Sequence, residues 1–231
     1  CNALVKSGDE YFNIFPAWNW TRIPGTTAPQ MAEVPLAQHD WQQEGTSQFA
    51  GGVTDSIYGA TAYAYDDTWA GIDTRAKKAW FFFDNEIVCL GSGITSSNAN
   101  PVFTTLNQRL AHKTDAVLYA EGKKVVAAKD ADHIKASNIS WVSHDGTGYV
   151  FPKGGNVVLD FDIQKGKWKD INHSMPNREE AYQVFALSLD HGVKPVDASY
   201  AYIVVPEASD AKTLDAYCKK QHVNILSNTA D

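Results

Sequence analysis

The sequence predicts an all-β fold, a large antiparallel β-sandwich that carries one late helix. Short runs rich in β-branched and aromatic residues recur along the 231 residues, separated by turns that contain Gly, Asn or Asp. Only one stretch has the apolar spacing of an amphipathic helix. Strands this numerous in one chain usually stack as two or more sheets, which is why a sandwich is expected.

The most distinctive segment is WNWTRIPGTT, residues 18–27. Period-2 alternation places Trp18 and Trp20 on one face of an extended strand, which Pro24-Gly25 then breaks. Two interpretations remain open. The tryptophans can be core residues at a sheet corner, or they can form a platform for a sugar whose polar groups Arg22 binds.

Strand-like runs continue along most of the chain. Residues 79–83 and 86–90 flank Asp84-Asn85 and predict a tight hairpin. The other predicted strands are 11–15, 58–65, 116–119, 124–128, 139–142, 148–151, 157–163, 184–189 and 200–205. Turn chemistry separates them at 121–122, 144–146, 153–155, 165–166 and 191–192.

One helix is predicted from residue 209 to about residue 221. Ser209 can cap its N-terminus, Leu214 and Tyr217 begin an apolar stripe, and Lys219-Lys220 suit the negative end of the helix dipole.

Composition excludes several classes of protein. The formal net charge of −7 argues against nucleic acid as a partner. It also means that the positive groups an acidic polysaccharide needs must be local or on another domain. No apolar run approaches the ~20 residues that span a bilayer, so no membrane partner is expected. The three cysteines and seven histidines lack metal-type spacing.

No sequence motif for phosphate binding, zinc hydrolysis or a serine nucleophile is present. Asp66-Asp67 and the pair Asp160 and Asp162 could suggest calcium, but solvated strand ends are the other interpretation, since no EF-hand spacing follows. By itself the sequence shows no active site.

Several stretches, in one order across nearly the whole chain, together resemble polysaccharide lyase family 8. This family comprises the chondroitin AC, hyaluronate and xanthan lyases, and the likeness is greatest to the chondroitin AC lyases of Bacteroidetes. The stretches are 11–20 with 23–27, 49–59, 77–83, 89–94, 104–108, 148–152, and 191–192 with 200–204.

The resemblance implies a galactose mutarotase-like β super-sandwich, with residues 1–231 as the central domain of a secreted or periplasmic bacterial enzyme. An N-terminal helical catalytic domain and a C-terminal β-sandwich would be absent from this chain and would be its partners. Such enzymes remove the C5 proton of a uronic acid and expel the 4-linked sugar by β-elimination. Their catalytic Asn, His, Tyr and Arg belong to the helical domain, so no catalytic residue is assigned here.

The resemblance also implies two substrate-binding candidates and one lost site. Trp41 matches an aromatic residue that reaches over the cleft and stacks on a sugar, and Arg22 is a further candidate for the cleft. Some relatives bind calcium at positions that match Asn19, Thr21 and Gln30, which are neutral here, whereas hard divalent ions need carboxylates. No metal and no cofactor are therefore expected.

Three hypotheses follow. The first is the non-catalytic central domain of a lyase acting on chondroitin, hyaluronan or a similar uronate polymer, where the chain forms a cleft wall. The second is a free-standing carbohydrate-binding module, whose binding would be lost on Trp41→Ala. The third is a mutarotase-like enzyme, which needs a His and a Glu facing each other in one cleft.

Overall fold

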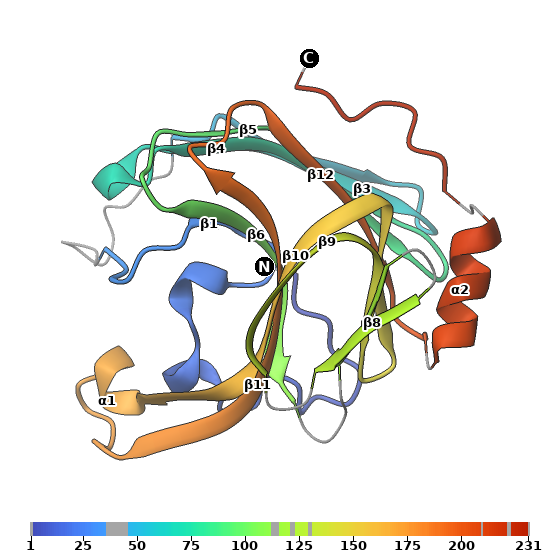
Figure 1. Ribbon diagram of the computed structural model, residues 1–231. Helices are drawn as coiled ribbons and strands as arrows, with labels where there is room; N and C mark the ends of the chain where they lie inside the picture. Colours follow the sequence, from blue (N-terminus) through green and yellow to red (C-terminus); the bar gives the residue numbers. More distant parts are fainter. Residues whose placement is uncertain are drawn as a thin grey trace.

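The computed structural model describes residues 2–35, 46–111, 116–120, 123–128, 131–208, 210–220 and 223–230. Twelve strands in this described part join in one antiparallel sheet that curls back on itself (Figure 1). The strands are β1 (Thr27–Pro29), β2 (Phe49–Thr54), β3 (Gly59–Asp67), β4 (Thr74–Phe82), β5 (Ile87–Ser96), β6 (Pro101–Leu110), β7 (Ala116–Ala120), β8 (Lys123–Ala128), β9 (Ala131–His144), β10 (Thr147–Lys167), β11 (Glu179–Val193) and β12 (Ala198–Val205). The helices are α1 (Trp168–Ile171) and α2 (Ala211–Lys220), with 3-10 turns η1 (Phe15–Ala17), η2 (Trp20–Arg22) and η3 (Trp69–Gly71).

The strand order explains how one sheet makes two layers. It runs β1-β6-β11-β10-β12-β5-β4-β3-β2. The long strand β10 pairs with β12 near its start and with β11 near its end, so it belongs to both layers. The layers are thus joined along β10, while the edge strands β1 and β2 leave the opposite side open. The all-β sandwich expected from the sequence is confirmed.

The main hydrophobic core fills the space between the layers. It joins residues of β4, β5 and β12 to residues of β6, β10 and β11, with Ile94, Leu106 and Phe185 almost fully buried. A second cluster lies under α2, where Leu214 packs on the outer side of β10 and β12. Burial of such apolar surface is the dominant stabilising contribution to the fold.

The predicted hairpin and the late helix are both confirmed. Chain reversal at Asp84-Asn85 joins β4 to β5, and the Phe83 N–H donates to the Glu86 carbonyl across it. The predicted helix is α2, capped by the Asp210 carboxylate, which accepts from the Thr213 N–H at 2.7 Å. The cap predicted at Ser209 lies outside the described residues. No helix in the described ranges is long and apolar enough to cross a membrane.

The expected strands at 11–15 and 18–21 were wrong. The first segment is a turn followed by η1, and the second runs into η2, where the Asn19 side chain accepts from the Thr21 N–H and favours a turn over an extended strand. Trp18 is half-buried against Ile14 and Tyr11, whereas Trp20 keeps 41% of its surface exposed. Of the two interpretations given above, packing on the core holds for Trp18 alone.

Three predicted turns are instead parts of long strands. Residues 153–155 form an irregularity in β10, with Gly154 at a φ of 76°, and not a break between two strands. Residues 165–166 lie within β10, and residues 191–192 lie within β11. Glycine signals a special backbone conformation, and a bulge satisfies that signal as well as a turn does.

Candidate functional site

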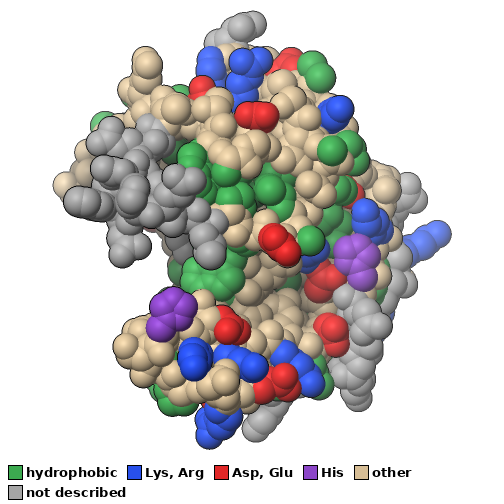
Figure 2. Space-filling view, turned by 90° about the vertical axis from the view of Figure 1, so that its left-hand side faces the viewer, with side chains coloured by type: hydrophobic (Ala, Val, Ile, Leu, Met, Phe, Trp, Pro, Cys, Tyr) green, Lys and Arg blue, Asp and Glu red, His purple; other side chains and the backbone are tan. Residues whose placement is uncertain are grey.

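An aromatic groove opens on the side where the edges of the two layers remain apart. It has a volume of about 380 Å³ and lies between the 20–35 segment and the inner face of β3 and β4. Figure 2 shows this side of the molecule hollowed, with hydrophobic side chains gathered in the hollow and both basic and acidic side chains on the lobe below it. The groove is lined by Trp20, Thr21, Gly25, Thr26, Thr27, Ala28, Pro29, Met31, Val34, Pro35, Tyr63, Tyr65, Asp67, Ile72, Lys78 and Trp80.

Strand register places four of these side chains on one face. Tyr63 pairs with Lys78 across β3 and β4, and Thr61 pairs with Trp80. Because residues two apart on a strand share a face, Tyr63, Tyr65, Lys78 and Trp80 all point between the layers. The Tyr63 and Tyr65 rings are 6.1 Å apart.

Among the described residues that line this groove, Lys78 is the only cation. Its side chain donates to the Gly25 carbonyl and lies over the Trp80 ring, with Nζ 5.7 Å from the ring centroid. The residue is 5% exposed, and burial lowers the pKa of Lys78 to about 7.

Arg22 lies in a different environment, in an ion-pair network. Its Nη1 pairs with the Asp160 carboxylate, and its Nε donates to Gln30 Oε1 at 2.9 Å. The guanidinium also lies over the Phe103 ring, 5.2 Å from the centroid. Asp160 accepts a second contact, from His133 Nδ1 at 2.7 Å, and burial lowers the pKa of this histidine. That Arg22 contacts substrate stays a prediction.

The three neutral positions matched to a calcium site come together in space. Thr21 Oγ1 donates to Asn19 Oδ1 at 2.7 Å and lies 3.4 Å from Gln30 Oε1. Gln30 in turn accepts from Arg22. Within the described residues, no group of three or more His, Cys, Asp or Glu side chains could hold a metal ion. Asp160, considered above as a calcium ligand, instead pairs with Arg22.

Trp41 lies outside the described residues, and its sugar contact stays a prediction. Among the described residues, His133 contacts Asp160, and His191 Nε2 lies 2.8 Å from Thr104 Oγ1. Neither of these contacts is the His and Glu pairing that mutarotase chemistry needs.

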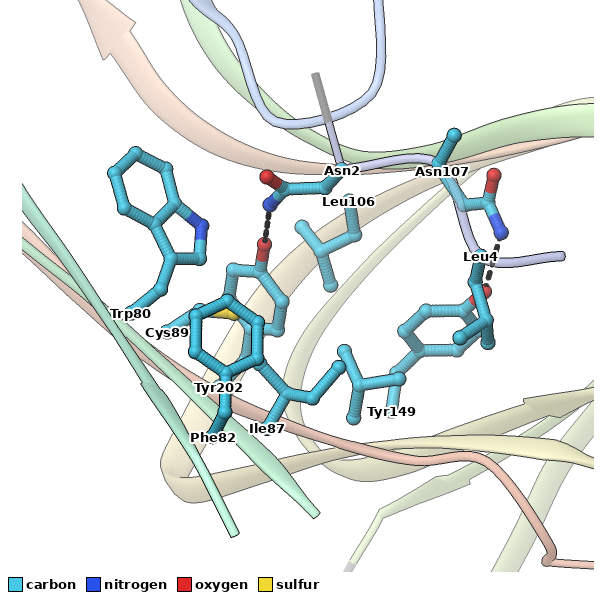
Figure 3. A pocket seen from close by; sticks show the side chains of 12 residues that line it. Asn2, Leu4, Trp80, Phe82, Ile87, Cys89, Leu106, Asn107, Tyr149 and Tyr202 are labelled. Atoms are coloured by element: carbon cyan, nitrogen blue, oxygen red, sulfur yellow. Dashed lines mark hydrogen bonds between the residues drawn. The ribbon is translucent and has the colours of Figure 1, made fainter. Parts of the chain in front are cut away.

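A second cavity of about 310 Å³ lies deeper between the layers and shares Trp80 with the groove (Figure 3). Asn2 donates to the Tyr202 hydroxyl at 3.0 Å, and Asn107 donates to the Tyr149 hydroxyl at 2.6 Å. The Trp80 indole N–H is buried and has no hydrogen-bond partner in the described structure. The cavity is lined mainly by apolar side chains, among them Leu4, Phe82, Ile87 and Leu106.

The groove was not predicted from the sequence, although the alternation of residue types along two of its strands is part of the pattern that forms it. Alternation in 58–65 already placed Tyr63 and Tyr65 on one face, and the same alternation along β4 places Lys78 beside Trp80. Alternation does not predict that β3 pairs with β4. It also does not predict that residues 20–31 pack over the face that carries these side chains. Both depend on contacts between segments far apart in the chain.

Comparison with known proteins gives a consistent result. The polysaccharide lyase family 8 super-sandwich domain matches residues 1–217. A chondroitinase-AC from Pedobacter heparinus is 42% identical over 223 residues, which is 96% of this chain and 30% of that protein. A hyaluronate lyase from Thermasporomyces composti is 32% identical and covers 96% of this chain and 28% of that protein.

Solved structures agree. A chondroitinase AC lyase, studied as enzyme–oligosaccharide complexes, superposes with a TM-score of 0.87 at 37% identity, over 96% of this chain and 32% of that one. The Streptomyces coelicolor A3 chondroitin AC lyase in complex with chondroitin sulphate gives 0.76 at 28% identity, over 97% and 28% of the two chains.

The chain therefore spans about a third or less of the length of these relatives. The likeness to the chondroitin AC lyases of Bacteroidetes, expected from the sequence, is confirmed by the Pedobacter relative. With the family domain matched over residues 1–217 and the fold shared, this chain belongs to polysaccharide lyase family 8 and has its super-sandwich fold.

Proposed function

We propose that residues 1–231 are the central super-sandwich domain of a larger lyase that cleaves uronic-acid-containing glycosaminoglycans by β-elimination. One observation carries the proposal: 96% of this chain aligns with only 30% of a chondroitinase-AC. The groups that remove the C5 proton would then lie in a helical domain outside this chain. A polymeric substrate of this kind suits an enzyme that is secreted or periplasmic.

An exposed apolar patch at one end of the sheet supports the presence of further domains. The β2–β3 turn and the β4–β5 turn meet there, and Tyr58 and Phe83 rings lie 5.9 Å apart. Exposed at this end are Val53, Ile57, Tyr58, Phe82 and Phe83. Contiguous apolar surface of this kind marks an interaction site, and we assign it to another domain of the same enzyme.

The aromatic groove supports a role as one wall of the substrate cleft. Aromatic rings stack on the apolar faces of sugars, and Trp20 already exposes its ring at the groove. Trp41 and Arg22 are the proposed substrate contacts carried over from the family resemblance. Their partner would be an acidic polysaccharide.

The test is an assay for the unsaturated uronate product, followed by its ultraviolet absorbance, with chondroitin sulfate and hyaluronan as substrates. The 231-residue chain should give no turnover, and the full-length enzyme should give turnover. Product formation by the 231-residue chain alone would overturn the placement of the catalytic groups.

Trp41 is tested in the full-length enzyme. Trp41→Ala should lower kcat/KM about tenfold or more, because a stacked ring in a sugar site contributes about 1–2 kcal/mol. Phe12→Ala is the matched control, since Phe12 is an exposed aromatic residue that does not line the groove. Equal effects of the two substitutions would contradict the sugar contact.

A further inference from the structure

Lys78 sits in a four-strand row on the inner face of one layer. The row runs from Tyr63 on β3 to Lys78 on β4, Gly91 on β5 and Tyr200 on β12, each directly opposite the next. Gly91 has no side chain, and the Tyr200 ring occupies the space where its Cβ would lie. The Lys78 side chain therefore lies between the Tyr63 and Tyr200 side chains, which limit its movement across the neighbouring strands.

The charge of Lys78 is incompletely compensated. An ammonium group has three donors, and the described residues give Nζ one hydrogen bond, to the Gly25 carbonyl. No ion pair joins Lys78 to a carboxylate in the described ranges, although six ion pairs form elsewhere in them. Isolated buried charges are costly, so a lysine kept in this position suggests a partner that binds from the groove.

The groove has the size and walls for one sugar unit. Its volume of about 380 Å³ lies within the range of small-ligand sites. Tyr63, Tyr65, Trp20 and Trp80 supply rings for the apolar faces of a sugar. Asp67 is the acidic residue in the lining, but it lies four residues along β3 from Tyr63, which is about 13 Å from the position opposite Lys78.

We infer that this groove is a subsite for an acidic sugar, in which the Lys78 ammonium binds a carboxylate or sulfate and the surrounding rings hold the sugar face. The inference rests on the proposed function for its choice of ligand. It adds a binding site within this chain, and it places the positive charge that an acidic polymer requires inside a chain whose net charge is −7.

The protonation of Lys78 then makes binding depend on pH. Facing it are Cys89 on β5, His191 on β11, Tyr200 and Tyr202 on β12, and Tyr63, Tyr65 and Asp67 on β3. Burial raises the pKa of Cys89 to about 12, raises those of Tyr65, Tyr200 and Tyr202, and lowers that of His191 to about 4. Of these shifted groups, Lys78 alone changes charge near neutral pH, so affinity should be higher at about pH 6 than at about pH 8.

The test measures binding of tetrasaccharides to the 231-residue chain by calorimetry. The probes are unsulfated chondroitin, 4-sulfated chondroitin and a carboxyl-reduced, desulfated chain. Lys78→Met should lower affinity for the acidic probes about tenfold or more and leave the neutral probe within about twofold, because one charge-assisted hydrogen bond is lost. Equal losses for the two acidic probes identify the carboxylate, which both carry, as the contact of Lys78, whereas a larger loss for the 4-sulfated probe identifies the sulfate.

Two further variants keep the test decisive. Lys78→Gln retains a donor for the Gly25 carbonyl, so it replaces Lys78→Met if that variant does not fold. Lys77→Met is the matched control, since Lys77 is the exposed neighbour on the opposite face of β4. The inference is overturned if wild-type chain does not bind the acidic probes, or if Lys77→Met and Lys78→Gln weaken binding equally. Lyase activity of the wild-type full-length enzyme tests the proposed function separately, because that assay measures product formation and not binding to this chain.

Discussion

At the residue scale, the cations Arg22 and Lys78 have opposite surroundings. Arg22 pairs with Asp160 and Gln30, whereas Lys78 has a carbonyl and an aromatic ring. Alternation along β4 predicts that one of Lys77 and Lys78 points inward. It does not predict which cation gains a carboxylate, because Asp160 comes from a strand 138 positions away from Arg22.

Glu10 is a second residue whose role is decided by local geometry. Burial by itself raises the pKa of Glu10, but hydrogen bonds from the backbone N–H groups of Ser7, Lys6 and Gly8 outweigh burial and lower it to about 2. A pKa below the unfolded value means that the ionised carboxylate stabilises the fold above about pH 4.5. This contribution is lost as the pH falls from there towards about 2.

We therefore predict that Glu10→Gln lowers the free energy of unfolding by about 2 kcal/mol at neutral pH. The difference from wild type should shrink as the pH is lowered from about 4.5 towards 2, because the wild-type carboxylate then takes up its proton. Urea denaturation at several pH values measures both effects. Glu33→Gln, at an exposed position, should change stability by less than about 0.5 kcal/mol. A Glu10→Gln effect independent of pH would contradict the argument.

At the element scale, β10 organises the molecule. It is 21 residues long, pairs with β9, β11 and β12, and so connects the two layers. Its end also packs on η1, where the space beside Gly166 is occupied by the Pro16 carbonyl. Sequence patterns predicted breaks at 153–155 and 165–166, because glycine there signals a turn. The structure uses Gly154 for an irregularity and Gly166 for close packing.

Gly166→Ala should therefore destabilise the fold by about 2–4 kcal/mol, because a new Cβ overlaps backbone that cannot rotate away. Thermal unfolding measures the change. Gly59→Ala is the control: a Cβ at Gly59 would meet its nearest neighbour, the Phe82 ring, at 3.7 Å, an ordinary contact. If the two substitutions lower Tm equally, the packing of η1 on β10 is not the cause.

At the scale of the whole molecule, the sandwich is closed along β10 and open between its edge strands. The open side holds the aromatic groove, and the ends of β2–β3 and β4–β5 carry the exposed apolar patch. Both features are consistent with a domain of a larger enzyme, since the chain spans about a third or less of the length of its relatives. A domain folded in isolation usually covers such surface, and one that docks on a neighbour does not need to.

The patch gives a prediction about the larger enzyme proposed above. Ile57 is 76% exposed, so Ile57→Asp should change the stability of the 231-residue chain by less than about 0.5 kcal/mol. In the full-length enzyme the same substitution should lower Tm by several degrees, because it places a charge in an apolar interface. Calorimetry on both proteins makes the comparison. An unchanged Tm in the full-length enzyme would show that no domain docks at this patch.

The sequence by itself determined the fold class, the hairpin at Asp84-Asn85, the late helix and the family, because these depend on local patterns and on ordered motifs. The tertiary structure alone decided three other matters: that residues 18–22 turn into η2, that β10 continues through its glycines, and that Lys78 lies with its charge incompletely compensated at the groove. Each depends on contacts between segments distant in sequence, such as the Gly25 carbonyl over β4. Such contacts override local propensity, because burial and hydrogen bonding across the sandwich outweigh the small preference of any one residue.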